Sequence, residues 1–250
     1  LAASFPPRTA GQTTVAAGCT DLFPATQPKA PAGPIWDITG LASLRGISHD
    51  DSGIRIGGAT TWSDMLRADL PAAFDALKLA AAEVGSVQIQ NTGTIAGNLC
   101  TASPAGDGIP CLMALDASVE LASLSGKRVL PLDQFLTGPR KTALRDDEIL
   151  RAIVIPKTAQ KGISHFVKLG ARKYLVISIS MVAARLVIDS GQSYGLSVVP
   201  LFILMGLMVE ENESLLAPGT ELKIGNKRLG VVKSGAFSPT LGVYIALAYI

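Results

Sequence analysis

The chain has 250 residues, of which 48% are hydrophobic and 17% charged, so a folded core is expected and whole-chain disorder is excluded. The formal net charge is only +2 and aromatic residues make up 5%, which argues against a nucleic-acid-binding surface. The 3 cysteines form no Cys-x-x-Cys pair and only 2 histidines occur, which argues against a disulfide framework or a metal site and favours a reducing, cytoplasmic location.

In the amino-terminal part, the residue pattern predicts few strands and one main helical region. A short apolar strand is expected at 13–17, and a second strand at 54–56, where apolar and charged residues alternate. Residues 61–85 hold the strongest helical pattern. From 88 to 107 helix-forming residues are few and turn residues many, so a long loop with a short helical piece is expected.

Strands dominate the next part of the chain. The segments 118–122 and 127–130 are expected to form a hairpin through a Ser-Gly turn. Further strands are expected at 149–155, 165–169 and 177–188, the last of them apolar on both faces. Because helices and strands are mixed without a regular β-α-β rhythm, an α+β fold is expected.

The carboxy-terminal part differs in composition. Residues 190–209 carry no charge, and a buried strand or helix is favoured over a membrane span, which a run of this length could also form. Residues 207–250, which overlap the end of this run, are expected to form a separate β-rich stretch, with strands near 221–224 and 227–233.

Two glycine-containing turns hold the residue types that are best suited to binding a ligand. The first is Ala17–Leu22, directly after the first expected strand, and the second is Asn91–Leu99, followed by Thr101 and Asp107. Glycine lets the backbone approach a ligand closely, and successive N–H groups in such turns can bind an anion. Neither turn is a P-loop or a G-x-G-x-x-G fingerprint, so these residues could hold a pyrophosphate without a lysine, or could be ordinary turns.

In their order and spacing, the two turns resemble the FAD-binding subunit of the molybdenum hydroxylases, the family that includes xanthine dehydrogenase and carbon monoxide dehydrogenase. The resemblance covers about residues 14–188 and continues through Ile56–Thr61, Val87–Asn91, Asp147–Leu150 and Phe166–Lys168. It implies a two-lobed α+β domain with FAD in the cleft between the lobes. In this chain the small β-rich tail would follow that domain.

The resemblance also implies which residues surround FAD. One wall would be formed by Val15, Ala17, Gly18, Cys19, Thr20 and Asp21. The other wall would be formed by Gly93, Thr94, Gly97, Asn98 and Thr101. Asp107 would contact the adenosine or ribityl part of the cofactor, and Leu150 and Lys168 would lie near its adenine or isoalloxazine ends. No side chain is expected to be catalytic, because the flavin carries the redox chemistry.

A division into domains and a set of partners follow from the same resemblance. The FAD-binding domain would span 1–160 and the start of a flavoprotein carboxy-terminal domain 161–189, with an apolar connector at 190–206 and the β-rich tail at 207–250. The expected partners are a molybdenum-cofactor subunit and an iron–sulfur subunit, from whose clusters electrons would pass through FAD to NAD or another acceptor.

The chain also departs from the family pattern. Cys19 and Ala96 stand where many relatives have glycine, and Gln90 where they often have arginine. A short stretch at 192–206 resembles the large membrane subunit of TRAP-type transporters, and 215–250 resembles the carboxy-terminal barrel of glycine-cleavage aminomethyltransferases. A composite chain with little or no activity and a folate-linked aminomethyltransferase fragment are therefore alternative interpretations.

Overall fold

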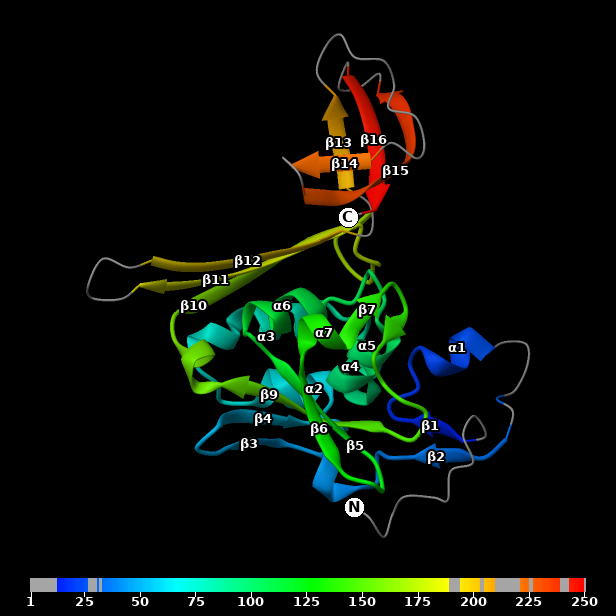
Figure 1. The fold of residues 1–250 in the computed structure, drawn as a ribbon, viewed down its shortest axis with the longest axis vertical. Coiled ribbons are helices and arrows are strands. Elements are labelled where there is room, and N and C mark those ends of the chain that lie inside the picture. Colours follow the sequence, from blue (N-terminus) through cyan, green and yellow to red (C-terminus); the bar gives the residue numbers. More distant parts are fainter. Residues whose placement is uncertain are drawn as a thin grey trace.

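The computed structural model of the chain describes residues 13–26, 31 and 33–188, together with the backbone of the strands at 194–202, 205–209, 221–224, 227–238 and 243–249. Figure 1 shows a five-stranded sheet, a group of helices and a three-stranded sheet stacked as successive layers. This arrangement confirms the expected α+β fold.

The five-stranded sheet is antiparallel and has the strand order β3-β4-β9-β5-β6. Its strands are β3 (Ile47–His49), β4 (Gly53–Gly57), β5 (Ser118–Ala122), β6 (Lys127–Pro131) and β9 (Ile149–Pro156). Ile54 and Ile56 pair in register with Ile155 and Ile153 and are fully buried, because alternate residues of a strand face the same side. The strands expected in this part of the chain are therefore confirmed, including the hairpin.

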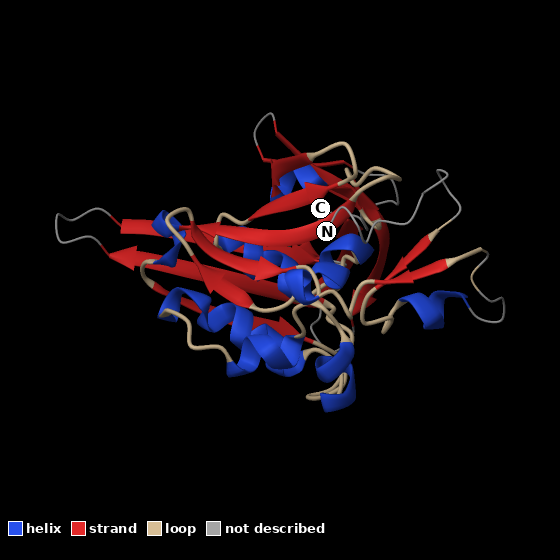
Figure 2. Cartoon of the chain, turned by 90° about the horizontal axis from the view of Figure 1, so that it is seen from below, coloured by secondary structure: helices blue, strands red, loops and turns tan. Residues whose placement is uncertain are grey.

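A layer of short helices covers the buried face of this sheet. The helices are α2 (Trp62–Arg67), η3 (Ala72–Phe74), α3 (Asp75–Glu83), α4 (Val87–Thr92), α5 (Ile95–Thr101), α6 (Gly108–Ala114) and α7 (Leu132–Phe135). Figure 2 shows from a second direction that most helices lie along one side of the strands. Thr61 caps α2 through a capping box, since its side chain accepts from the Asp64 N–H while the Asp64 carboxylate accepts from the Thr61 N–H.

The prediction of a long loop at 88–107 was wrong, because α4 and α5 occupy most of it. Ser86 caps α4, and the Thr94 hydroxyl oxygen caps α5. A hydrogen bond of 3.1 Å from the Trp62 N–H to the carbonyl of Gly93 fixes the junction between the two helices. These caps and tertiary contacts stabilise helices whose threonine, asparagine and glycine residues have low intrinsic propensity.

A three-stranded antiparallel sheet covers the other side of the helices. It consists of β10 (Ile163–Leu169), β11 (Ser180–Ile188) and β12 (Tyr194–Phe202), in that order. Phe166 and Met181 belong to the same buried cluster as Leu77 of α3, so one core runs through the helical layer. β11 begins at Ser180 rather than at 177, and β12 lies within the segment expected to be a connector. The division into domains stays a prediction.

Smaller elements complete the part of the chain that resembles a flavoprotein. β1 (Thr14–Ala16) confirms the strand expected at 13–17 and pairs in parallel with β2 (Ile35–Asp37). The other elements are α1 (Leu22–Thr26), η2 (Ala42–Leu44), β7 (Leu136–Gly138), β8 (Lys141–Thr142) and η4 (Lys157–Gln160). β7 and β8 form a small hairpin beside α5, and the turn of this hairpin contributes a residue to the site described below.

The tail forms a four-stranded sheet in the order β13-β16-β15-β14. Its strands are β13 (Met205–Val209), β14 (Glu221–Ile224), β15 (Lys227–Ser238) and β16 (Val243–Tyr249). The strands expected near 221–224 and 227–233 are confirmed, the second being longer than expected. Within the described residues, no helix is both long and apolar enough to cross a membrane, and the uncharged run contains β12 and β13 instead.

Substitution of Leu77 tests whether one hydrophobic core joins the helical layer to the three-stranded sheet. The substitution Leu77→Ala removes a fully buried side chain and is expected to lower the free energy of unfolding by about 2–5 kcal/mol. Leu124→Ala is the matched control, because Leu124 is 61% exposed and its loss should change that free energy by no more than about 0.5 kcal/mol. Denaturant unfolding measures both, and equal losses in the two variants would contradict the proposed core.

Candidate cofactor-binding site

A cavity of about 610 Å³ lies between the loop after β1, helix α5 and the segment before β11. Its size falls within the usual range of small-molecule sites. All the residues expected to surround FAD line this cavity except Gly93 and Lys168. Two turns that are distant in the sequence therefore meet at one site, as the resemblance implies.

The loop after β1 lies directly on the junction between α4 and α5. A Cβ atom added at Gly18 would lie 2.0 Å from the carbonyl oxygen of Thr92 and 2.7 Å from the Cα of Gly93, so only glycine fits. Gly93 consequently lies beneath the loop and not in the cavity wall. This close approach of two backbones sets the position of the following residues, Thr20 and Asp21, at the cavity.

The beginning of α5 supplies the neutral polar part of the wall. The Thr94 hydroxyl oxygen accepts a hydrogen bond of 3.0 Å from the Gly97 N–H, and a Cβ atom at Gly97 would lie only 2.8 Å from that oxygen. Asn98 also lines the cavity, and its Oδ1 atom is buried without a hydrogen-bond partner among the described residues. A donor on a bound ligand would satisfy this acceptor, which is costly to leave unpaired.

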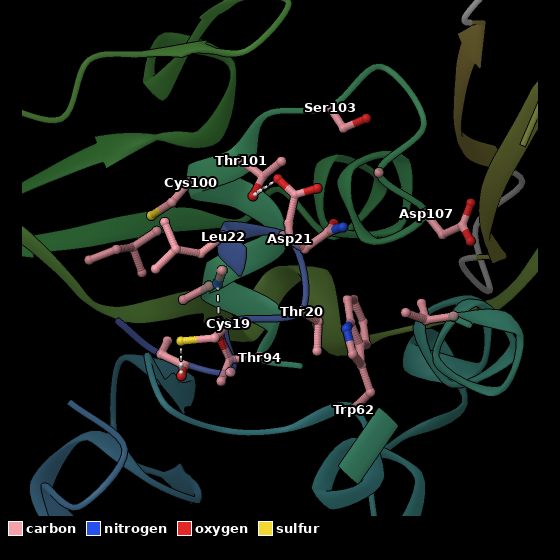
Figure 3. A pocket seen from close by; sticks show the side chains of 18 of the residues that line it. Cys19, Thr20, Asp21, Leu22, Trp62, Thr94, Cys100, Thr101, Ser103 and Asp107 are labelled. Carbon is pink, nitrogen blue, oxygen red and sulfur yellow. Dashed lines mark hydrogen bonds between the residues drawn. The ribbon is translucent and has the colours of Figure 1, made fainter. Parts of the chain in front are cut away.

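Cys19 occupies a backbone conformation that favours glycine. Its φ angle is +56°, in the left-handed region, which is unfavourable for a residue with a Cβ atom and open to glycine. The thiol turns back and donates to the carbonyl of Ala17 at 3.2 Å, as Figure 3 shows. Burial, and secondly the Asp37 carboxylate, raise the pKa of the Cys19 thiol, so it is protonated at neutral pH.

Asp107 lies at the far side of the cavity from Asp21 (Figure 3) and is almost fully buried. Its Oδ2 atom accepts from the Lys168 ammonium at 2.9 Å, and its Oδ1 atom accepts from the Ser178 hydroxyl. Lys168 also donates to the carbonyl of Glu83 at 3.1 Å. The structure thus places Lys168 behind Asp107, where it holds the carboxylate, and not in the cavity wall.

Glu148 is a lining residue that the sequence did not reveal. Its buried carboxylate accepts from the Arg128 guanidinium at 2.6 and 2.7 Å and from the Arg145 N–H at 2.9 Å. These hydrogen bonds, above all the one from Arg128, lower the pKa of Glu148 although burial acts in the opposite direction. Arg128 on β6 and Glu148 before β9 come together because both strands pair with β5. Such a long-range contact cannot be predicted from a local sequence motif.

Arg140 is a second charged lining residue that the site prediction did not contain. It lies in the turn between β7 and β8, and its Nη1 atom is 3.4 Å from Oδ2 of Asp21. The Thr101 hydroxyl donates to the same carboxylate oxygen at 3.4 Å, the contact drawn as a dashed line in Figure 3. The carboxylate thus joins the first loop, the end of α5 and the β7–β8 turn.

An apolar wall completes the cavity. It is formed by Val84, Leu144, Ile149, Leu150, Leu175, Val176 and Ile177. Ile177 is 77% exposed, which is unusual for a large apolar side chain next to a cavity. The cavity therefore combines an apolar surface with neutral polar groups, and it is complementary to a ligand that has both a flat apolar part and a polar or anionic part.

Comparison with known proteins identifies such a ligand. Residues 6–158 match the family described as the FAD binding domain in molybdopterin dehydrogenase. The chain belongs to this family. Residues 203–250 match a different one, the glycine cleavage T-protein C-terminal barrel domain, which agrees with the resemblance seen in the tail.

Individual relatives support the assignment. The nicotinate dehydrogenase FAD-subunit of Eubacterium barkeri is 39% identical over 149 residues, which are 58% of this chain and 50% of the relative. The xanthine dehydrogenase FAD-binding subunit of Escherichia coli O157:H7 is 36% identical over 161 residues, or 63% of this chain and 55% of the relative. The chain thus spans about half the length of these relatives.

Solved structures show the same fold. Reconstituted CO dehydrogenase from Oligotropha carboxidovorans superposes with a TM-score of 0.69 and 25% sequence identity, covering 77% of this chain and 70% of that one. FAD is the cofactor of the family, and the residues present here fit it. Gly18 and Gly97 both line the cavity without a side chain that would narrow it, and Asn98 has a buried acceptor without a partner among the described residues.

Gly18 tests the contact between the two turns. Gly18→Ala is expected to lower the melting temperature and to displace the loop, because the new Cβ atom would overlap the carbonyl of Thr92. Gly40→Ala is the control, since a Cβ atom at Gly40 meets no atom within 4 Å. Thermal unfolding compares the two variants, and an unchanged melting temperature in Gly18→Ala would show that the loop does not rest on Thr92.

Ionisation of the Glu148 carboxyl group should make the free energy of unfolding depend on pH. Because its folded-state pKa is lowered from 4.5, the ionised carboxylate stabilises the fold above this value, and the stabilisation is lost as the pH falls through the lowered pKa. Glu148→Gln should therefore be much less stable than the unaltered chain at about pH 7, and the gap should narrow toward about pH 3. Denaturant unfolding across this range measures the gap, and a constant gap would refute the assignment.

Proposed function

We propose that this chain is the FAD-binding component of a molybdenum-containing hydroxylase or dehydrogenase. In that role it passes electrons from the iron–sulfur clusters of a partner to NAD or another acceptor. The observation that carries the proposal is the cavity itself, in which a glycine-based cradle and neutral polar groups adjoin an apolar wall in a chain of this family. When bound, FAD would supply the redox chemistry, while the protein binds and orients it.

Different residues of the cavity would bind different parts of FAD. The backbone N–H of Gly18 and the hydroxyl of Thr20 would hold the pyrophosphate, as neutral donors that need no lysine. Gly97 and Thr101, whose N–H and hydroxyl already donate to Thr94 and Asp21, would border it. Asp107 would accept hydrogen bonds from ribityl or adenosine hydroxyls, with its carboxylate held in place by Lys168 and Ser178.

The apolar wall would cover the rings of the cofactor. Leu150 and Ile177 both line the cavity, and burying a flat ring against such side chains removes apolar surface from water. The high exposure of Ile177 fits this role, because a ring lying on it would shield the side chain from solvent.

The names of the relatives favour a chain that acts within a larger enzyme. They include a FAD-subunit, a FAD-binding subunit and the carbon monoxide dehydrogenase medium chain of Hydrogenophaga pseudoflava. We therefore propose a molybdenum-cofactor subunit and an iron–sulfur subunit as partners, and a cytoplasmic location. The hydroxylated substrate would be handled by the molybdenum subunit.

The visible spectrum of the purified whole chain, before and after incubation with FAD and desalting, tests the proposal. Retained absorbance bands near about 370 and 450 nm are expected, because the protein would hold the flavin tightly enough to survive desalting. A soluble protein that stays colourless after incubation would contradict the proposal and favour a composite chain that has lost the function.

Gly97 tests the location of the cofactor. Gly97→Asp should abolish FAD retention, because the new side chain would overlap Thr94 Oγ1 and place a negative charge beside the pyrophosphate. Gly40→Asp adds the same charge at an exposed position with free space and should retain FAD. Flavin absorbance after desalting compares the two, and normal FAD affinity in Gly97→Asp would remove α5 from the site.

A further inference from the structure

Arg140 is the only lysine or arginine among the described residues that line the cavity. Its side chain is 60% exposed, and among the described residues its guanidinium pairs with Asp21, with 3.4 Å between Nη1 and Oδ2. The other charged lining residues besides Asp21 are the carboxylates of Asp107 and Glu148, which are buried and paired with Lys168 and Arg128. Arg140 is therefore the positive charge of the cavity that a ligand can reach.

The backbone of Arg140 is fixed although its side chain is exposed. Its N–H donates to the carbonyl of Ala102 at 2.8 Å, and its φ angle is +54°, which is uncommon for a residue with a side chain. Ala102 directly follows α5, the helix that supplies the neutral polar wall. The turn thus presents the guanidinium at the end of the wall where Thr101 and Asp21 meet.

The contact with Asp21 leaves most of the guanidinium free for a ligand. An exposed ion pair of this length contributes little to folding stability, so the position can be substituted without unfolding the protein. Arginine carries five N–H donors in a planar fork, which matches the oxygen atoms of a phosphate group. Neutralisation of Asp21 by Arg140 would also reduce the repulsion between this carboxylate and an approaching anion.

We propose that Arg140 recognises a phosphate group of a nucleotide bound in this cavity and makes the site selective for a dinucleotide over the flavin ring system alone. The inference rests on the proposed FAD-binding function and adds a recognition residue to it. The phosphate belongs either to FAD itself or to a second nucleotide that binds at the cavity mouth.

Three variants of the whole chain test the proposal. Arg140→Gln removes the charge, Arg140→Lys keeps the charge without the planar fork, and Arg67→Gln is the matched control. Arg67 is 69% exposed and pairs with Asp64 at 2.8 Å, but does not line this cavity. Quenching of flavin fluorescence gives the dissociation constants for FAD and for riboflavin at low and high salt.

Arg140→Gln is expected to weaken FAD binding by about tenfold or more, as for a lost hydrogen bond to a charged group, with riboflavin binding unchanged. Arg140→Lys should restore part of the affinity, and the loss should shrink at high salt because the interaction is electrostatic. If FAD binding is unchanged but ADP no longer binds to the FAD-loaded Arg140→Gln chain, the phosphate belongs to a second nucleotide.

Two results would overturn the inference alone. One is that Arg140→Gln behaves like Arg67→Gln toward FAD, riboflavin and ADP, and the other is that it weakens riboflavin binding as much as FAD binding. If the unaltered chain binds neither flavin, the proposed function itself fails, and this inference fails with it. The behaviour of the unaltered chain therefore separates the two failures.

Discussion

The close approach of the Gly18 backbone to Thr92 and Gly93 is the constraint on which the site depends. Nothing larger than a hydrogen atom fits between these segments, so the loop after β1 and the α4–α5 junction form a single unit. The loop is also anchored from the other side, because the Ile38 N–H donates to the carbonyl of Ala16 at 2.9 Å. With the loop held on both sides, one wall of the cavity is built before any ligand contributes to it.

Two of the carboxylates that border the cavity are neutralised by residues outside it. The carboxylates of Asp107 and Glu148 border the cavity, but each is neutralised from outside it, by Lys168 and by Arg128. Burying such pairs brings little net stability, since desolvation offsets most of their attraction. The pairs also fix positions: Lys168 links the three-stranded sheet to Asp107, and Arg128 links the β5–β6 hairpin to Glu148.

The chain joins sequences of two families, and a complete three-stranded sheet lies between the two matched regions. The flavoprotein match ends at residue 158 and the barrel match begins at residue 203. Strand β12 lies between the two and still pairs with β11 along its whole length, from Ser180 opposite Phe202 to Ile188 opposite Tyr194. Sheet pairing uses backbone hydrogen bonds, which place few demands on the identity of the added strand beyond its length and β propensity.

The sequence by itself determined the α+β class, the main strands and the pair of glycine-containing turns, because these depend on local patterns and on motifs. Through the resemblance that the turns carry, it also indicated a set of site residues, all of which except Gly93 and Lys168 line the cavity. It misjudged α4 and α5, whose stability comes from caps and from contacts with residues around Trp62. Glu148 and Arg140 entered the site only in the tertiary structure, since their partners Arg128 and Asp21 are distant in the sequence and no periodic pattern records such a contact.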